Sequence, residues 1–298
     1  MIKSDRRTRS LPALAFLLLA TAPACALAAG DAACNPNDAR PAQVAQAWLD
    51  RKPIPALELA DVTAARCFRQ AFLESLEPVL GPQIGYKVGL YTAAGQARYG
   101  SAGPVLGLLF RNMLIPEGQL IAANYGVQPT WESDLLVVVG DGAINTARTR
   151  EDIYRNLRAI RPFIELTNVN YDPGVKVNAL QLEALDVGAR MGVAGAETVL
   201  PQTPKGLADL SALSVETTLR SEGKDAVERV RAVEALGDPI EIVRFARDAA
   251  LAAGHPLKAG DVISLGVFTP AKAPRPNDVV SVRYLMGDQA PSVSARFK

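Results

Sequence analysis

The sequence predicts an α+β fold. Segments with the alternating or continuous apolar pattern of strands are frequent, whereas regular strand–helix–strand alternation is rare. The chain has 298 residues, of which 49% are hydrophobic, enough for a substantial core in one large domain or two small ones. It contains no internal repeat, low-complexity run or obvious linker. One domain that follows a short helical arm is therefore the simplest interpretation.

The N-terminal third of the mature chain is predicted to be mainly helical. Residues 42–50 and 62–80 carry apolar residues at helical spacing, and Gly81-Pro82 ends the second stretch. Residues 84–90 then have the apolar character of a strand, and residues 93–99 form a short helix. We therefore expect a helical arm over 29–80 and a catalytic domain over 81–298.

The middle of the chain is predicted to contain two strands. Residues 104–114 are apolar without a clear period, and residues 127–139 form a strand that ends in a glycine turn. An amphipathic helix is expected over 151–160, followed by a second strand-like stretch over 161–167.

The C-terminal part is predicted to be mostly strands. Residues 213–219 alternate between apolar and more polar side chains. A helix is expected over 238–253, because Asp238 can cap it and Pro239 suits its first position. Three further strands are expected, at 262–268, 279–284 and 291–297.

The first residues are typical of a signal peptide that is removed on export. Lys3, Arg6, Arg7 and Arg9 precede an apolar stretch over 11–24, and Ala26-Leu27-Ala28 fits a cleavage site. We expect segment 1–28 to be the signal, and the mature protein to be soluble and periplasmic. A net charge of +1 without a basic stripe argues against nucleic acid as a partner.

Cleavage after Ala28 leaves two cysteines, Cys34 and Cys67. A cysteine pair in an oxidising compartment favours a disulfide between the mature N-terminus and the first long helix. The alternative is that Cys67 is a small buried apolar residue on a helix. A disulfide would stabilise the fold by about 3–4 kcal/mol in the chain-entropy model.

Three acids are the candidate metal ligands. Glu132 and Asp134 lie one residue apart on an expected strand and so share a face, and Glu165 lies in the second strand-like stretch. Carboxylates on one apolar-flanked face are costly to bury unless a cation lies between them. The alternative is a solvated strand face. Because His255 is the only histidine and lies in a helix-to-loop turn, Mg²⁺ or Mn²⁺ is favoured over zinc.

Lys87 is the candidate catalytic residue. It lies between apolar residues of an expected strand, and the flanking Gly85 and Gly89 allow a ligand or another backbone to approach. A lysine that reaches the surface of an edge strand is the alternative. A lysine beside a metal-bound carboxylate substrate can balance charge or transfer a proton.

Gly266 and Thr269 are candidate substrate-binding residues. They belong to the segment Gly266-Val267-Phe268-Thr269-Pro270, where a backbone N–H and a hydroxyl could face an anion. An ordinary strand followed by a loop is the competing interpretation.

The blocks that carry these residues resemble, in order and spacing, the fumarylacetoacetate hydrolase superfamily, and within it the 2-keto-4-pentenoate hydratase and 4-oxalocrotonate decarboxylase branch. The resemblance runs from about Ala42 to the C-terminus. Its blocks are Gly85-Tyr86-Lys87-Val88-Gly89-Leu90, Pro104-Val105-Leu106-Gly107-Leu108-Leu109, Gln128-Pro129-Thr130-Trp131-Glu132-Ser133-Asp134, Pro162-Phe163-Ile164-Glu165, Pro256-Leu257-Lys258-Ala259-Gly260-Asp261 and Gly266-Val267-Phe268-Thr269-Pro270.

The resemblance implies a mixed β-sheet rolled into a barrel-like core with peripheral helices. It also implies a Mg²⁺ or Mn²⁺ site formed by the three acids, with Lys87 at the position of the family's active-site lysine. Members act on small 2-oxo or 2-hydroxydienoic acids and often form homo-oligomers. We therefore expect a metal-dependent lyase, a hydratase of an acid such as 2-hydroxypenta-2,4-dienoate.

The chain departs from the pattern of the hydratases at three places. Val105 stands where they often carry an acid, Val267 stands where a Ser is usual, and segment 186–190 lacks their Asn and Ser. Decarboxylation, or C–C hydrolysis of a related 2-oxo acid, is therefore the alternative reaction. An exported protein that binds such acids without turnover is the alternative from another class.

Overall fold

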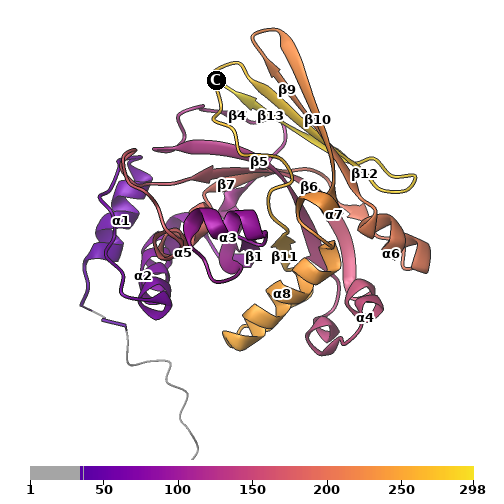
Figure 1. Ribbon diagram of the computed structural model, residues 1–298, viewed down its shortest axis with the longest axis horizontal. Helices are drawn as coiled ribbons and strands as arrows, with labels where there is room; N and C mark the ends of the chain where they lie inside the picture. The colour runs from indigo at the N-terminus through magenta and orange to yellow at the C-terminus, as the bar shows by residue number, and fades with distance from the viewer. Residues whose placement is uncertain (1–33, 36) are drawn as a thin grey trace, which may run out of the picture. The chain divides into compact units, whose positions relative to one another are not determined.

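The computed structural model describes residues 34, 35 and 37–298, so the expected signal segment 1–28 lies outside the described residues. Two β-sheets and several surrounding helices make up the described part (Figure 1). The larger sheet is mixed and curls into a half-barrel, so the expected α+β class is confirmed. No helix of the described residues is long and apolar enough to cross a membrane.

The larger sheet has eight strands and carries the candidate site. Its spatial order is β2-β1-β11-β5-β6-β7-β3, and β8 pairs with β6. The sequence order is scrambled in space, because β11 from the C-terminal part pairs in parallel with β1 and antiparallel with β5. The strands are β1 (Gln83–Gly89), β2 (Val105–Phe110), β3 (Leu114–Pro116), β5 (Pro129–Val139), β6 (Leu157–Asn168), β7 (Met191–Ala194), β8 (Thr198–Val199) and β11 (Val262–Ser264).

The second sheet has five strands in the order β10-β9-β12-β13-β4. Its apolar face packs with one face of the larger sheet and with helix α8 (Pro239–Ala252) in the main core. The strands are β4 (Leu120–Ile121), β9 (Ser214–Ser221), β10 (Lys224–Arg231), β12 (Val279–Leu285) and β13 (Ser292–Phe297).

Two N-terminal helices pack in a second core, which also contains Leu136 and Phe163 of the larger sheet. Helix α1 (Arg40–Leu49) contacts α2 (Val62–Leu80), and α2 contacts α5 (Ala179–Ala184) (Figure 1). The remaining helices are α3 (Ala93–Tyr99), α4 (Arg150–Arg155), α6 (Pro204–Ser211) and α7 (Ala232–Ala235), with 3₁₀ turns η1 (Arg111–Met113), η2 (Gly142–Thr146) and η3 (Asp186–Gly188).

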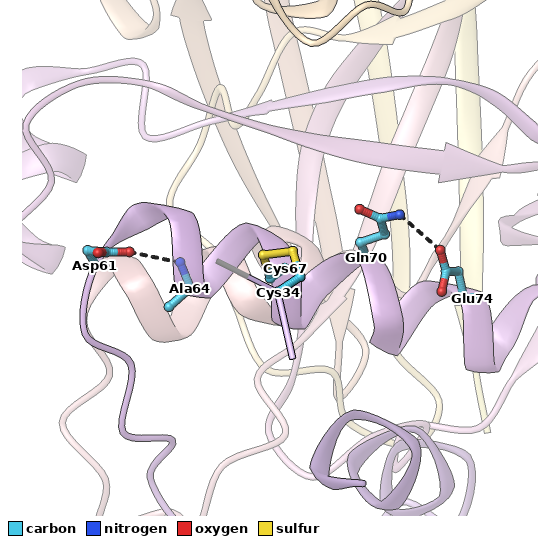
Figure 2. The surroundings of a disulfide bond; sticks show 6 residues. All are labelled: Cys34, Asp61, Ala64, Cys67, Gln70 and Glu74. Atoms are coloured by element: carbon cyan, nitrogen blue, oxygen red, sulfur yellow. Dashed lines mark hydrogen bonds between the residues drawn. A yellow bond between two sulfur atoms is a disulfide. The ribbon is translucent and has the colours of Figure 1, made fainter. Parts of the chain in front are cut away.

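The expected disulfide is present between Cys34 and Cys67 (Figure 2). The Cα atoms lie 5.2 Å apart, within the usual range for a disulfide. Helix α2 is fixed nearby, because the Asp61 carboxylate accepts a hydrogen bond of 2.8 Å from the Ala64 N–H (Figure 2). The disulfide therefore ties the N-terminal segment to a capped, well-packed helix.

Two expected elements have different bounds in the structure. The helix expected over 151–160 ends at Arg155, and residues 157–160 belong to β6, because they pair with β5 and β8 in the buried sheet. The strand expected over 262–268 ends at Ser264, because Gly266 has a φ of 110°, outside the range of a strand. Tertiary pairing overrides the helical pattern in the first case.

Breaking the disulfide should lower stability by about 3–4 kcal/mol, because the bond closes a loop across 33 residues in the unfolded chain. Urea unfolding of Cys34→Ala, Cys67→Ala and the double variant should give nearly equal losses, since each change removes the same bond. Reductant should destabilise the wild type only. Additive losses in the double variant would contradict a disulfide.

Candidate functional site

Lys87 is buried on the second strand from one edge of the larger sheet, with 4% of its surface exposed. On β1 it lies between Gly107 of β2 and Ser264 of β11. Its ammonium group is 2.7 Å from Oε1 of Glu165 and donates a hydrogen bond of 3.1 Å to the Val187 carbonyl. A buried ammonium needs such partners, so the alternative of a surface lysine on an edge strand does not describe this residue.

The two glycines beside Lys87 allow the close approach that the sequence predicts. A Cβ on Gly85 would lie 1.9 Å from the Val262 carbonyl oxygen, and one on Gly89 would lie 2.3 Å from a Val187 methyl group. Only glycine fits at both positions. The gap at Gly89 is what allows the η3 backbone to contact β1 and the Val187 carbonyl to reach Lys87.

The three acids come from two adjacent strands. Glu132 of β5 is directly opposite Glu165 of β6, and Asp134 is opposite Phe163. Residues directly opposite each other in an antiparallel pair share a face, and so do residues two apart on one strand. Glu132, Asp134 and Glu165 therefore lie on one face of the sheet, and the ion pair with Glu165 brings Lys87 to them.

Asp134 is held by hydrogen bonds from β11 and the turn that follows it. Its carboxylate accepts bonds from the Ser264 hydroxyl, from the Gly266 N–H at 2.9 Å and from the Leu135 N–H at 2.5 Å. Behind it, the Tyr284 hydroxyl of the second sheet contacts the Asp134 and Phe163 carbonyls. The two sheets together therefore fix the position of this acid.

Glu165 is buried and its carboxylate lacks ordinary hydrogen bonds. Only 1% of it is exposed; its Oε1 lies 2.7 Å from the Lys87 ammonium, whereas its Oε2 has no partner among the described residues. A buried carboxylate oxygen without a partner is costly unless a second cation or a donor binds it. The second oxygen of Glu165 is therefore available as a ligand for a cation.

Charge and donor type both fit a divalent cation with oxygen ligands. Three carboxylates and one ammonium leave an excess of two negative charges when all four groups are ionised. Glu132 and Glu165 would hold the ion. The Asp134 carboxylate accepts hydrogen bonds from Ser264 and Gly266, and its remaining lone pairs would complete the ligand set. As they stand, no three acid, histidine or cysteine side chains of the described chain converge on one point.

The pKa values show the same imbalance of charge. Burial raises the pKa of Glu132 to about 7, with Lys87 acting against the shift and Glu165 adding to it. Burial and the Glu165 charge also raise the pKa of Asp134. Burial acts to lower the pKa of Lys87, but the attraction of the acids outweighs it and the pKa is raised. Lys87 is therefore charged at neutral pH, while Glu132 and Asp134 resist ionisation without a further cation.

A fourth acid, Asp186, lies near the cluster and was not singled out from the sequence as a site residue. Its Oδ1 accepts a 2.8 Å hydrogen bond from the Leu108 N–H, and its Oδ2 is buried without a partner among the described residues. Burial raises the pKa of Asp186 to about 6, with Arg69 acting against the shift. Asp186 and Val187 both have positive φ, which is strained for these residue types. Neither residue type usually adopts a positive φ, so the sequence does not predict this turn.

The two expected substrate-binding residues, Gly266 and Thr269, do not present free hydrogen-bonding groups beside Lys87. The Gly266 N–H is used by Asp134. The Thr269 hydroxyl lies 2.8 Å from that of Ser133, which alternation places on the opposite face of β5 from Glu132 and Asp134. Thr269 is also buried, with 2% exposed. Their part in substrate binding stays a prediction.

Comparison with known proteins gives relatives in both sequence and structure, although no protein-family model matches the chain. A 2-keto-4-pentenoate hydratase from Dechloromonas aromatica is 27% identical over 72% of this chain and 77% of its own length. A 4-oxalocrotonate decarboxylase from Pseudomonas putida is 24% identical over the same shares.

The chain is related to the hydratase and decarboxylase branch of the fumarylacetoacetate hydrolase superfamily. A solved 4-oxalocrotonate decarboxylase from Pseudomonas putida G7, complexed with magnesium and adipate, superposes with a TM-score of 0.73 at 22% identity, over 87% of this chain and 96% of that one. A fumarylpyruvate hydrolase from Pseudomonas aeruginosa, in complex with Mn²⁺ and pyruvate, superposes at 0.52 and 16% identity, over 72% and 89%. The fold is therefore that of this superfamily, as expected.

Replacing Lys87 with Met should destabilise the protein by about 3–5 kcal/mol, because Glu165 would be left as an unpaired buried charge. Lys205→Met is the matched control, since it breaks an exposed helical pair with Asp209 that contributes no more than about 0.5 kcal/mol. Urea unfolding in the presence of a chelator measures both.

Adding Glu165→Gln to Lys87→Met should recover part of the loss, because the double variant has no unpaired charge at that pair. If Lys87→Met cost no more than Lys205→Met, the buried pair would not have the importance that its geometry implies.

Proposed function

We propose that the chain is a divalent-metal-dependent enzyme that acts on a small 2-oxo acid. The cluster formed by the buried Lys87, Asp134 and Glu165 and the half-buried Glu132, with its excess negative charge, is the observation that carries the proposal. The relatives support it, since those compared above are named as hydratases, decarboxylases and hydrolases of such acids. Solved neighbours with magnesium, calcium or Mn²⁺ support a divalent ion without distinguishing which one.

The cluster suits a substrate whose carboxylate and 2-oxygen lie side by side. A bound divalent cation would act as a Lewis acid toward these two oxygens. The remaining excess charge would be small, because Lys87 already neutralises one carboxylate. Lys87 carries the positive charge of the cluster, 2.7 Å from Glu165, and its pKa is raised by the acids, so we assign it charge balance or proton transfer.

Addition of water to the distal double bond of a 2-hydroxydienoic acid, such as 2-hydroxypenta-2,4-dienoate, is the reaction that we favour. In this reaction Lys87 would hold the proton at the oxygen end of the substrate while the burial of β1 and β5 excludes bulk water. The relatives named as hydratases support this choice.

Decarboxylation or C–C hydrolysis of a related acid is the second candidate, and one position favours it. Val105, where hydratases of this branch often have an acid, is buried against Val187 and Leu182 and has no polar atom to offer. A reaction that needs no second acid near Lys87 would tolerate this apolar contact. The solved neighbour named a 4-oxalocrotonate decarboxylase is in line with it. The oligomeric state stays a prediction.

Replacing Glu132 with Gln should weaken Mn²⁺ binding and lower turnover by at least about 100-fold each, because it removes a charged oxygen ligand from the cluster. Calorimetry with Mn²⁺ measures the first, and an assay that separates water addition, CO₂ release and C–C cleavage measures the second and decides between the reactions. Glu234→Gln is the control, since Glu234 is exposed and its ion-pair partner among the described residues is Arg231.

A wild-type protein that binds neither Mg²⁺ nor Mn²⁺ would refute the metal-dependent function. Tight binding of a 2-oxo acid without any of the three reactions would instead indicate a non-catalytic binding protein.

Export to the periplasm is a further part of the proposal. The basic residues before the apolar stretch 11–24 support it, and so does the disulfide, which is of a kind that oxidising compartments maintain. Expression of the full chain in a bacterial host should give mature protein in the periplasmic fraction. Mass spectrometry should find an N-terminus near residue 29 and oxidised Cys34 and Cys67. Unprocessed protein with free thiols in the cytoplasm would contradict export.

A further inference from the structure

Two arginines without acidic partners line a hollow on the described part of the chain. The hollow has a volume of about 350 Å³ and lies between the end of α1, the residues around β4 and the start of β7. Arg51 and Arg190 are its charged residues, and Gln119 and Tyr125 add polar groups. No acid lines it, and no carboxylate in the described part lies within ion-pairing distance of either guanidinium.

Arg190 is held rigidly but keeps donors free. Its guanidinium lies 4.1 Å from the ring centroid of Trp48, and its Nη1 donates a 3.1 Å hydrogen bond to the Trp48 carbonyl. Stacking occupies the face of the guanidinium, whereas the N–H groups lie along its edge. Only one of these donors has a partner among the described residues, so the rest of the edge is free to bind an anion.

Arg51 places a second positive charge beside Arg190 at a backbone position that favours glycine. It follows helix α1 with a φ of 56°, and its N–H and that of Lys52 close the helix end on the Trp48 and Ala47 carbonyls. An arginine there gives up the stability that glycine would provide. Its side chain makes only a long 3.4 Å bond to the Asn124 carbonyl. The position of Arg51 is therefore not explained by packing.

Two neighbouring guanidiniums repel each other unless an anion lies between them. Burial first, and then the nearby charge of Arg51, lower the pKa of Arg190 to about 10. The excess positive charge of Arg51 and Arg190 is the inverse of that at Glu132 and Glu165, where a cation would balance excess negative charge. The hollow is lined by neither Lys87 nor the three acids, so it is a separate site.

We propose that the hollow between Arg51 and Arg190 binds a small anion with at least two negatively charged oxygens, a phosphate or a dicarboxylate. Such oxygens match the paired N–H donors of a guanidinium, and a volume of about 350 Å³ admits a molecule of a few heavy atoms. The apolar residues Ile115, Leu120 and Ile121 at the wall suit a short carbon chain between two carboxylates. This site does not depend on the proposed function.

Arg51→Gly tests the site without harming the fold. Because glycine prefers the positive φ at residue 51, this variant should be as stable as the wild type or more stable in phosphate-free buffer. Anion binding should nevertheless weaken at least about tenfold, which corresponds to the loss of one charged hydrogen bond. A purely structural role for Arg51 predicts the opposite pattern, a less stable protein with unchanged binding.

The measurement is calorimetry and thermal unfolding of the full protein with inorganic phosphate and, separately, with succinate. Both are done at constant ionic strength and with a chelator, so that the metal-free acid cluster repels the anions. Arg111→Gln is the matched control, because Arg111 lines a different hollow that also contains Glu117 and Glu197. It should bind both anions like the wild type.

Binding of phosphate alone would identify a phosphorylated ligand, and binding of succinate alone a dicarboxylate; either supports the site. The proposal is overturned if the wild type binds neither anion, or if Arg51→Gly binds them as tightly as the wild type does.

Discussion

The buried pair of Lys87 and Glu165 is the interaction on which the arrangement of the site depends. An ammonium and a carboxylate at this depth are stable only if they stay together, and they come from strands far apart in sequence. Their pairing therefore requires β1 and β6 to lie in one sheet at a fixed offset. The intervening β11 and β5 set that offset, and they add Ser264, Glu132 and Asp134 to the same region. The ammonium of Lys87 neutralises one of the three acids. The other two, Glu132 and Asp134, leave the site with negative charge that a cation would balance.

The packing around the larger sheet excludes water from these charged groups and fixes their positions. The Tyr284 hydroxyl of the second sheet contacts the carbonyls of Asp134 and Phe163, so the packing of the two sheets fixes β5 and β6 at the site. On the other face, helix α2 and its disulfide hold a separate apolar core against the sheet. The strained turn at Asp186 and Val187 supplies a carbonyl to Lys87. Strain of this kind persists only where the surroundings enforce it.

Much of the site could be predicted from the sequence, because its signals are local. Period-two alternation places Glu132 and Asp134 on one face, and the glycines around Lys87 signal a close approach. What could not be predicted depends on pairing between distant segments. Nothing local indicates that β11 separates β1 from β5, so the Gly266 N–H was expected to face a ligand although it binds Asp134. In the same way, residues 157–160 have a helical pattern but complete a strand, because their partners on β5 and β8 are buried. The positive φ of Asp186 and the free Oδ2 of its side chain leave no pattern in the residues themselves.

The same electrostatic argument applies with opposite sign at the two proposed sites, and one residue shows how they are kept apart. Tyr125 lines the hollow of Arg51 and Arg190, and its hydroxyl lies against the carbonyls of Thr130 and Thr167. These carbonyls are two residues from Glu132 and Glu165 on their strands, so the tyrosine stands between the positive hollow and the negative cluster. Burial raises the pKa of Tyr125, with the two acids adding to the shift, so the ring stays neutral there. The uncharged Tyr125 keeps the arginines from forming ion pairs with the acids. Each cluster can therefore be neutralised only by an ion from solution.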